Sequence, residues 1–167
     1  TIALPAPSLY GQFNHLDRVD IVLDALLQIG FDAVYEVARA AEYVSDITRT
    51  LLEKGGLPKP VISSACPAVV RLIRVRFPEL LPHVLPVRAP MEVAAQLAKA
   101  EAVKKTGLPP EKIGAIFISP CPAKVTAVKM PIGVESCAVD GVVAAHEIYS
   151  QLLRVMKAGS GAGRRGG

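Results

Sequence analysis

Residues 113–124 read Ile-Gly-Ala-Ile-Phe-Ile-Ser-Pro-Cys-Pro-Ala-Lys, a run that passes from an apolar stretch into a turn. The first half has the length and isoleucine content of a buried β-strand. The second half ends that strand, because proline has no backbone N–H to donate to a neighbouring strand. A short buried strand that leads straight into a Cys-Pro turn is typical of a parallel sheet with polar loops at its carboxyl edge.

Further short apolar runs occur on both sides of this one, and longer segments of helical period separate them. We expect strands over residues 1–4, 31–36, 60–63, 113–118 and 138–143, and helices over 16–29, 38–54, 67–77, 91–105 and 145–157. Strands joined by helices of this length form right-handed crossovers. The sequence therefore predicts an α/β fold, with a parallel β-sheet flanked by helices on both faces.

The composition supports one compact domain. The chain has 167 residues, of which 51% are hydrophobic, and a chain of this length buries roughly two-thirds of its unfolded surface. We expect residues 1–157 to form the domain and residues 158–167, rich in glycine, serine and arginine, to form a flexible tail.

The charge and the cysteines narrow the class of protein. The net charge of +4 is dispersed rather than gathered in a stripe, which argues against nucleic-acid binding, and we expect no membrane span. Three cysteines are an odd number and lie far apart in sequence, so a disulfide framework is not expected. A reducing compartment fits best, and we expect a cytoplasmic protein.

Three segments follow predicted strands and are therefore expected at the carboxyl edge of the sheet, where sites form in such folds. They are Pro7-Ser8 after the first strand, Ala65-Cys66-Pro67 after the third, and Cys121 to Lys124 after the strand over 113–118. Two cysteines at one edge can share a metal site.

The chemistry of these residues suits iron. A thiol at a helix N-terminus lies at the positive end of the helix dipole and loses its proton more readily, and thiolate is the ligand of iron–sulfur clusters. Lys124 adds positive charge beside Cys121. A second interpretation stays open at this point: each cysteine is a small buried residue and Lys124 a solvated loop lysine.

A family resemblance adds to this reading. Residues 63–67, Ser-Ser-Ala-Cys-Pro, resemble the first cluster motif of iron-only (FeFe) hydrogenases, and residues 120–124, Pro-Cys-Pro-Ala-Lys, resemble their second. Shorter matches to the same family occur at 6–8, 30–34, 77–83 and 139–142. The resemblance covers residue 1 to about residue 157.

The resemblance implies that Cys66 and Cys121 are two of the four cysteine ligands of a 4Fe-4S cluster, the cubane of the hydrogenase H-cluster. It also implies that Lys124 donates to a cyanide of the two-iron subcluster, and that Pro7 and Ser8 line the other cyanide. The third motif of the family, which carries the other two ligands, has no match here. We therefore expect the rest of a hydrogenase chain or a partner subunit to supply them, a cluster that is absent or incomplete in this chain alone, and a ferredoxin-type electron partner.

Departures from the family pattern concern proton transfer. By the family's register, Ala65 and Ala127 replace residues of the proton relay, and Thr50 and Leu85 replace two more. Alanine and leucine cannot carry a proton, so whether the parent protein is an enzyme or a hydrogen or redox sensor stays open. The alternative is a cofactor-free α/β interaction or regulatory module with the same fold. Cys137 lies outside the motifs and is interpreted as a small core or loop residue.

Overall fold

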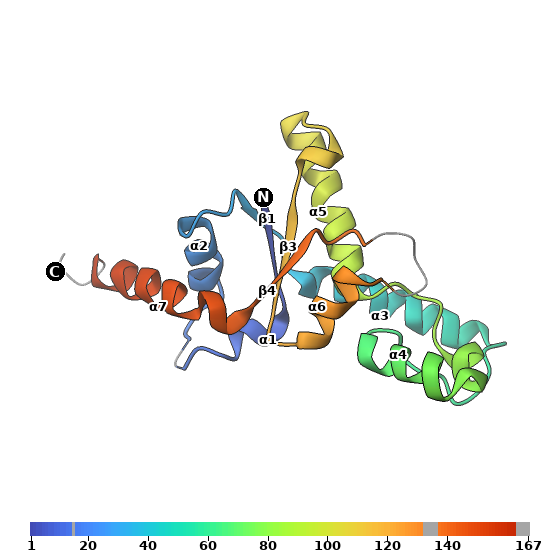
Figure 1. Cartoon of the computed structure of the whole chain (residues 1–167). Helices are drawn as coiled ribbons and strands as arrows, with labels where there is room; N and C mark the ends of the chain where they lie inside the picture. The colour runs from blue at the N-terminus through green and yellow to red at the C-terminus, as the bar shows by residue number, and fades with distance from the viewer. Residues whose placement is uncertain (15, 132–136, 163–167) are drawn as a thin grey trace.

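The computed structural model describes residues 1–14, 16–131 and 137–162, of which 159–162 are described as helix backbone only. At its centre is a parallel sheet with the strand order β2-β1-β3-β4 (Figure 1). The strands are β1 (Ile2–Pro5), β2 (Ala33–Val34), β3 (Ala115–Ser119) and β4 (Gly141–Ala144). The α/β fold predicted from the sequence is confirmed.

Both faces of the central strands are buried, as their unbroken apolar runs predict. Consecutive strand side chains point to opposite faces. Leu4 and Phe117 join a core with α3 and α5, whereas Ala3 and Ile118 join a second core with α2 and α7. The helices are α1 (Pro7–Tyr10), α2 (Asp20–Gln28), α3 (Val37–Lys54), α4 (Pro67–Arg76), α5 (Pro90–Thr106), α6 (Pro122–Lys129) and α7 (Ala145–Ala162), with the 3-10 helices η1 (Pro78–His83) and η2 (Pro110–Lys112).

A row of small side chains lets α5 lie close to both the sheet and α3. Ala94 and Ala95 are fully buried and Ala98 nearly so, in the same core as Leu4 and Phe117. Alanine loses no side-chain entropy in a helix and fills little volume, so the backbone of α5 packs near its neighbours. The first turn of α5 is thereby fixed beside the segment that leads into β4.

The predicted strand over residues 60–63 is wrong. Ile62 forms only an isolated parallel bridge with Val84, and two backbone hydrogen bonds, Ile62 N to His83 O and Leu85 N to Ile62 O, hold it. Pro60 begins this segment and Pro82 and Pro86 flank its partner, and proline has no N–H with which to lengthen the bridge into a strand. The segment is not part of the four-stranded sheet.

Other differences concern element ends. The predicted strand over 31–36 is reduced to β2, and β3 and β4 begin two and three residues later than predicted, at Ala115 and Gly141. Two helices, α1 and α6, occupy segments for which the sequence pattern gave only a loop or no assignment. The helix α7 continues to Ala162, into the segment expected as a tail, and residues 163–167 of that tail lie outside the described residues.

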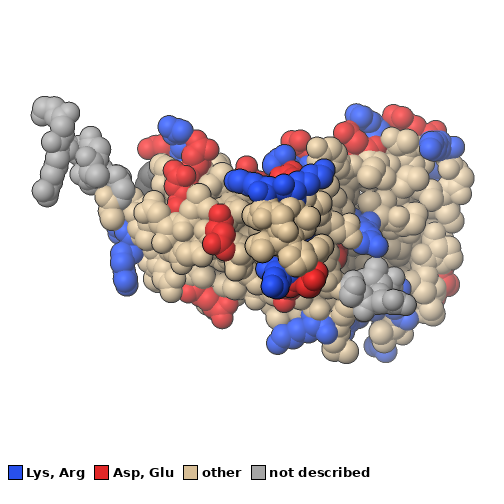
Figure 2. Space-filling model, turned by 90° about the horizontal axis from the view of Figure 1, so that it is seen from above, with Lys and Arg blue, Asp and Glu red and all other residues tan. Residues whose placement is uncertain are grey.

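Away from the sheet, α3 extends beyond the sheet edge, and α4 and η1 lie near its far end (Figure 1). Basic and acidic side chains are interspersed on the face seen in Figure 2, with broad areas that carry neither charge. None of the helices in the described part of the chain is both long and apolar enough to cross a bilayer.

Candidate metal centre

Two turns of nearly identical geometry carry Cys66 and Cys121. Cys66 is the N-cap of α4, with φ −96° and ψ 107°, and Cys121 is the N-cap of α6, with φ −95° and ψ 110°. In both, the next residue is proline at the first helical position, where its fixed φ suits the helix and its missing N–H leaves no donor unpaired. Each cysteine therefore stands at the positive end of a helix.

Serine hydroxyls support both turns. The Oγ of Ser119 accepts the Cys121 amide at 3.2 Å, and the Oγ of Ser63 accepts the Ala65 amide at 3.3 Å. In addition, the Ser64 hydroxyl donates to the carbonyl of Val87 at 2.6 Å. The Cys121 amide is one of the N–H groups that α6 leaves unpaired at its start, and the other two bonds hold the segment that leads into α4.

Lys124 joins the two turns. Its Nζ donates to the carbonyl of Ala65, the residue before Cys66, at 2.8 Å, although 59 residues separate them in sequence. Burial lowers the pKa of Lys124 from its usual range, and the nearby Cys121, Cys66 and Glu92, in that order, act in the opposite direction. The ammonium group therefore lies within electrostatic reach of both cysteines.

A second contact shows how the two cysteine-bearing helices lie. The guanidinium of Arg71, in the middle of α4, donates to the carbonyl of Met130, just after α6, at 2.9 Å. The Lys124 bond pairs the beginnings of the two helices, and the Arg71 bond pairs the later part of α4 with the end of α6. Two side-chain hydrogen bonds therefore connect α4 and its preceding turn to α6, one near the start of α6 and one just after its end.

This arrangement corrects one premise drawn from the sequence. Cys121 follows β3 at the carboxyl edge of the sheet, as predicted. Cys66 does not follow a strand of the sheet, because residues 60–63 are not part of it. The bond from Lys124 to the Ala65 carbonyl instead links the segment before Cys66 to the first turn of α6.

Pro7 and Ser8 lie at the same sheet edge. The amide of Ala6 donates to the carbonyl of Ile118 at 2.9 Å, which sets the end of β1 beside the end of β3. Both Pro7 and Ser8 are exposed. Pro7 borders α3 in a shallow groove with Ala41 and Ser45, and the Ser8 carbonyl accepts the Gln12 side chain.

Three of the four positions proposed to have lost relay residues, Ala65, Leu85 and Ala127, border two hollows. Ala65 lines an open groove of about 720 Å³ against α3, together with Ser45 and Thr48. Ala127 lines a separate cavity of about 340 Å³, which Leu85 also borders. Alanine methyl groups at both places offer no group that exchanges a proton.

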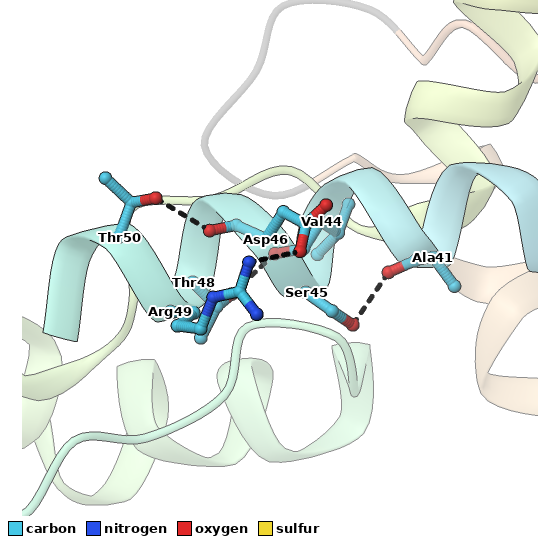
Figure 3. A network of polar contacts seen from close by, with 7 residues as sticks. All are labelled: Ala41, Val44, Ser45, Asp46, Thr48, Arg49 and Thr50. Carbon is cyan, nitrogen blue, oxygen red and sulfur yellow. Dashed lines mark hydrogen bonds and ion pairs between the residues drawn. The ribbon is translucent and has the colours of Figure 1, made fainter. Parts of the chain in front are cut away.

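The hydroxyls of α3 are bonded within their own helix (Figure 3). Ser45 donates to the Ala41 carbonyl, Thr48 to the Val44 carbonyl and Thr50 to the Asp46 carbonyl, each at 2.7–2.9 Å. Thr48, rather than Thr50, lines the groove beside Ala65. Such back-bonding is common for serine and threonine within helices and leaves no donor hydrogen for another partner.

The candidate site offers two cysteine thiols, half of the four that a 4Fe-4S cluster needs. Among the described residues, no three or more His, Cys, Asp or Glu side chains gather closely enough to hold a metal ion. Two thiols at helix N-termini beside a desolvated lysine suit an iron–sulfur cluster chemically, but a cubane takes four thiolates. The chain therefore fits the cluster as a contributor of two ligands.

The sequence pattern does not single out Glu92, and it predicts Cys137 to be a small core or loop residue. Cys137 packs at the margin of the core under α5, and its Sγ donates to Oε1 of Glu92. Burial first, and the bond to Glu92 second, raise the pKa of Cys137 to about 12. Nothing in the local pattern pairs these residues, because 45 positions separate them.

The protein is an α/β protein with a parallel sheet and two Cys-Pro turns that Lys124 links. Comparison with known proteins gives its family. Residues 1–157 match the family described as "Iron only hydrogenase large subunit, C-terminal domain". The chain belongs to this family.

Curated relatives of two kinds are similar to the chain. The periplasmic [Fe] hydrogenase large subunit of Nitratidesulfovibrio vulgaris is 26% identical over 74% of this chain, which spans 32% of that relative. Iron hydrogenase 1 of Clostridium pasteurianum is 25% identical over 74% of this chain and is matched over 23% of its length. The cytosolic Fe-S cluster assembly factor nar1 of Aspergillus flavus is 28% identical over 65% of this chain and is matched over 18% of its length.

Solved structures support the fold. The [FeFe]-hydrogenase HydA1 from Chlamydomonas reinhardtii superimposes with a TM-score of 0.75 at 20% identity, over 92% of this chain and 42% of that one. The chain thus spans less than half of the length of these hydrogenase chains.

Proposed function

We propose that this chain is one lobe of a hydrogenase-like iron–sulfur protein, in which Cys66 and Cys121 supply two of the four thiolates that hold a 4Fe-4S cluster. The observation that carries the proposal is the hydrogen bond from Lys124 to the Ala65 carbonyl, which fastens the start of α6 to the segment before α4. It supports a location of the two Cys-Pro turns close to one another. That is the placement two ligands of one cluster require.

Lys124 has a second role in this proposal. An ammonium group has three N–H donors, of which the Ala65 carbonyl takes one. The remaining donors are available to an anionic ligand, and the family resemblance assigns them a cyanide of the two-iron subcluster. The positive charge also offsets the negative charge of a thiolate-bound cluster. Pro7 and Ser8 are proposed to line the other cyanide, which their place at the same sheet edge supports.

The other two thiolates belong, in this proposal, to a polypeptide outside residues 1–167. Either the remainder of a hydrogenase chain or a partner subunit supplies them, and a ferredoxin-type protein exchanges electrons with the cluster. The three free cysteines favour a reducing compartment, and we propose the cytoplasm. The names of the relatives include both a periplasmic and a cytosolic protein.

Slow hydrogen chemistry or sensing fits the site better than fast hydrogen turnover. General acid–base steps need a titratable group within hydrogen-bond reach, and Ala65 and Ala127 provide none. Thr50 donates its hydroxyl hydrogen to its own helix. The nar1 proteins, named as cytosolic Fe-S cluster assembly factors, are about as similar to this chain as the hydrogenases, so the similarity is consistent with a cluster-related role of either kind.

The alternative is a cofactor-free α/β module that uses its surface for protein contacts. Exposed apolar side chains on α4, Leu72 and Val75, are 52% and 72% exposed and are consistent with such a role. The proposed pairing of the two thiols on one metal ion separates the alternatives, since a contact module has no need of it.

Cobalt(II) tests this pairing, because a metal bound by thiolates shows sulfur-to-metal charge-transfer absorption. We expect the reduced chain to show this absorption, and Cys66→Ser and Cys121→Ser each to lower it at least about tenfold at limiting cobalt, since one thiolate holds the ion far more weakly than two. Cys137→Ser is the matched control and should leave it unchanged. Equal loss in all three variants, or in none, contradicts the proposed pair.

Anaerobic reconstitution with iron and sulfide tests the number of ligands. We expect weak and incomplete iron incorporation by the isolated chain, because two thiolates leave half of the coordination of a cubane unmet. Iron and sulfide analysis with electron paramagnetic resonance measures it. A stable four-iron cluster in residues 1–167 alone contradicts the proposal that another polypeptide completes the site.

A further inference from the structure

The carboxylate of Glu92 bridges two groups of the segment that leads into β4. Its Oε1 accepts the Cys137 thiol, and its Oε2 accepts the Ala138 amide at 2.9 Å. Both carboxylate oxygens are therefore engaged, and the thiol keeps its hydrogen as long as it donates to an anion.

Glu92 also borders the candidate metal centre. It lines the cavity of about 340 Å³ together with Pro67, the residue after Cys66, and Ala127, one helical turn beyond Lys124. It is one of the charges that act on Lys124. One carboxylate thus binds the third cysteine of the chain and acts electrostatically on the lysine beside the other two.

A separate contact fastens the same segment further along α5. The Nζ of Lys99 lies 2.7 Å from Oδ2 of Asp140, and that carboxylate also accepts the Ala115 amide. Val139, between the two fastenings, is 2% exposed. The segment would therefore keep one attachment to α5 if the other were removed, which separates the effect of Glu92 on the thiol from its effect on the fold.

We propose that Glu92 excludes Cys137 from the iron site by binding its thiol and the following amide, so that this lobe offers Cys66 and Cys121 as its two ligands. The inference rests on the proposed function. The contrast between the cysteines supports it: two thiols stand at positive helix ends, where iron is favoured, and the third donates to a carboxylate, where its charged form is disfavoured.

Alkylation of Cys137 tests the inference without iron. In a background of Cys66→Ala and Cys121→Ala, the iodoacetamide labelling rate of Cys137 is measured from pH 7 to pH 10. We expect Glu92→Gln to raise the rate at pH 8.5 at least about tenfold, because removal of the carboxylate lowers the thiol pKa and each pKa unit is tenfold in thiolate. Glu92→Asp, which keeps the charge, should label at a rate near that of the parent.

Lys99→Gln is the matched control, because it removes the other fastening of the same segment. Its labelling rate should stay within about twofold of the parent, and circular dichroism should show the same helix content in every variant. An unchanged rate in Glu92→Gln, or equal increases in Glu92→Gln and Lys99→Gln, would overturn the role of Glu92. If Glu92→Gln fails to fold, slow labelling in folded Glu92→Asp supports the role and fast labelling overturns it.

Cobalt(II) then tests the exclusion itself in the chain with all three cysteines. The thiolate absorption of Glu92→Gln should be roughly 1.5 times that of the wild type, since three thiolates would bind the metal instead of two. The gain should disappear in the double variant with Cys137→Ala. A gain that survives this second substitution, or no gain, overturns the inference. A wild type without thiolate absorption instead contradicts the pairing of Cys66 and Cys121, and the labelling result still decides whether Glu92 restrains Cys137.

Discussion

The turns at Cys66 and Cys121 share one backbone geometry but are held in different ways. Cys121 follows β3, which pairs with β1 on one side and β4 on the other. The segment before Cys66 is outside the sheet, and an isolated bridge, the Ser64 hydroxyl and the Lys124 side chain hold it. The Cys-Pro sequence therefore sets the turn, whereas the position of each turn depends on tertiary contacts of very different strength.

The largest expected loss of stability comes from a mutation in β3, the strand that precedes Cys121. Ile118 is fully buried between α2, α7 and the sheet, so Ile118→Ala should lower the free energy of unfolding by about 2–5 kcal/mol. Ile62→Ala, on the Cys66 side, should cost about 1 kcal/mol or less because Ile62 is only partly buried. Urea unfolding followed by circular dichroism measures both, with the exposed Ile47→Ala as control. Equal costs for Ile118 and Ile62 would mean that the two turns are equally integral to the core.

The next effect concerns the link between the turns. Lys124→Met keeps the aliphatic stem but loses the bond to the Ala65 carbonyl. We expect opening of the segment around Cys66 to become easier by about 1 kcal/mol, or roughly fivefold in amide exchange, the usual net value of one hydrogen bond. Hydrogen exchange with mass spectrometry should show this for residues 62–70 and leave β3 unchanged. Faster exchange in both places would indicate that Lys124 supports the whole lobe.

Cys137, which lies in neither turn, should make the stability of the protein depend on pH. Its thiol pKa rises from the ordinary 9.0 to about 12 in the folded chain, so above pH 9 the unfolded chain releases a proton that the folded chain retains. The free energy of unfolding should therefore fall as pH rises from about 9 toward 12, by less than about 1 kcal/mol between pH 9 and pH 10 because Cys137 is only partly buried. Urea midpoints across this range should show a steeper fall in the wild type than in Cys137→Ala, since Tyr10 titrates alike in both. Parallel curves would show that Cys137 does not titrate differently in the two states.

The smallest effect compares the serines of the two turns. Ser119 is 5% exposed and Ser63 is exposed, although each accepts an amide of its own turn. Ser119→Ala should cost about 1 kcal/mol, because the Cys121 amide loses a buried acceptor, and Ser63→Ala less than about 0.5 kcal/mol, because water replaces the hydroxyl. Thermal unfolding of the two variants side by side measures the difference, and a reversed order would contradict the stronger burial of the Cys121 turn.

The spacing of apolar residues predicted most of the strands and helices. Prolines mark two places where this prediction failed, the run at 60–63 and the start of α6. The runs at 1–4 and 113–118 are central strands because both their faces are apolar and no proline interrupts them. The run at 60–63 also contains β-branched residues, but it pairs only through Ile62 with the segment at Val84, and prolines on both sides limit the length of this bridge. Pro122 opens α6 just as Pro67 opens α4, so the missed helix carried the same signal as the predicted one.

The candidate site was accessible from sequence only in part. Cys66, Cys121 and Lys124 follow from short motifs that predict their turns. The bond from Lys124 to Ala65 and the contact of Glu92 with Cys137 join residues 59 and 45 positions apart, and local patterns contain no information on such pairs. Long-range polar contacts depend on how the helices pack against one another. The sequence pattern shows only which face of each helix is apolar.

The alanines of α5 limit which mutations the lobe can accept over evolution. A larger residue at Ala94, Ala95 or Ala98 has no free volume to enter, so it would push the helix off the sheet and carry its first turn, with Glu92, away from residues 137–138. Drift in this helix should therefore concentrate at outward positions such as Gln96 and Lys104. Random mutagenesis with selection for folded protein should recover many replacements at these two positions and hardly any at the alanines.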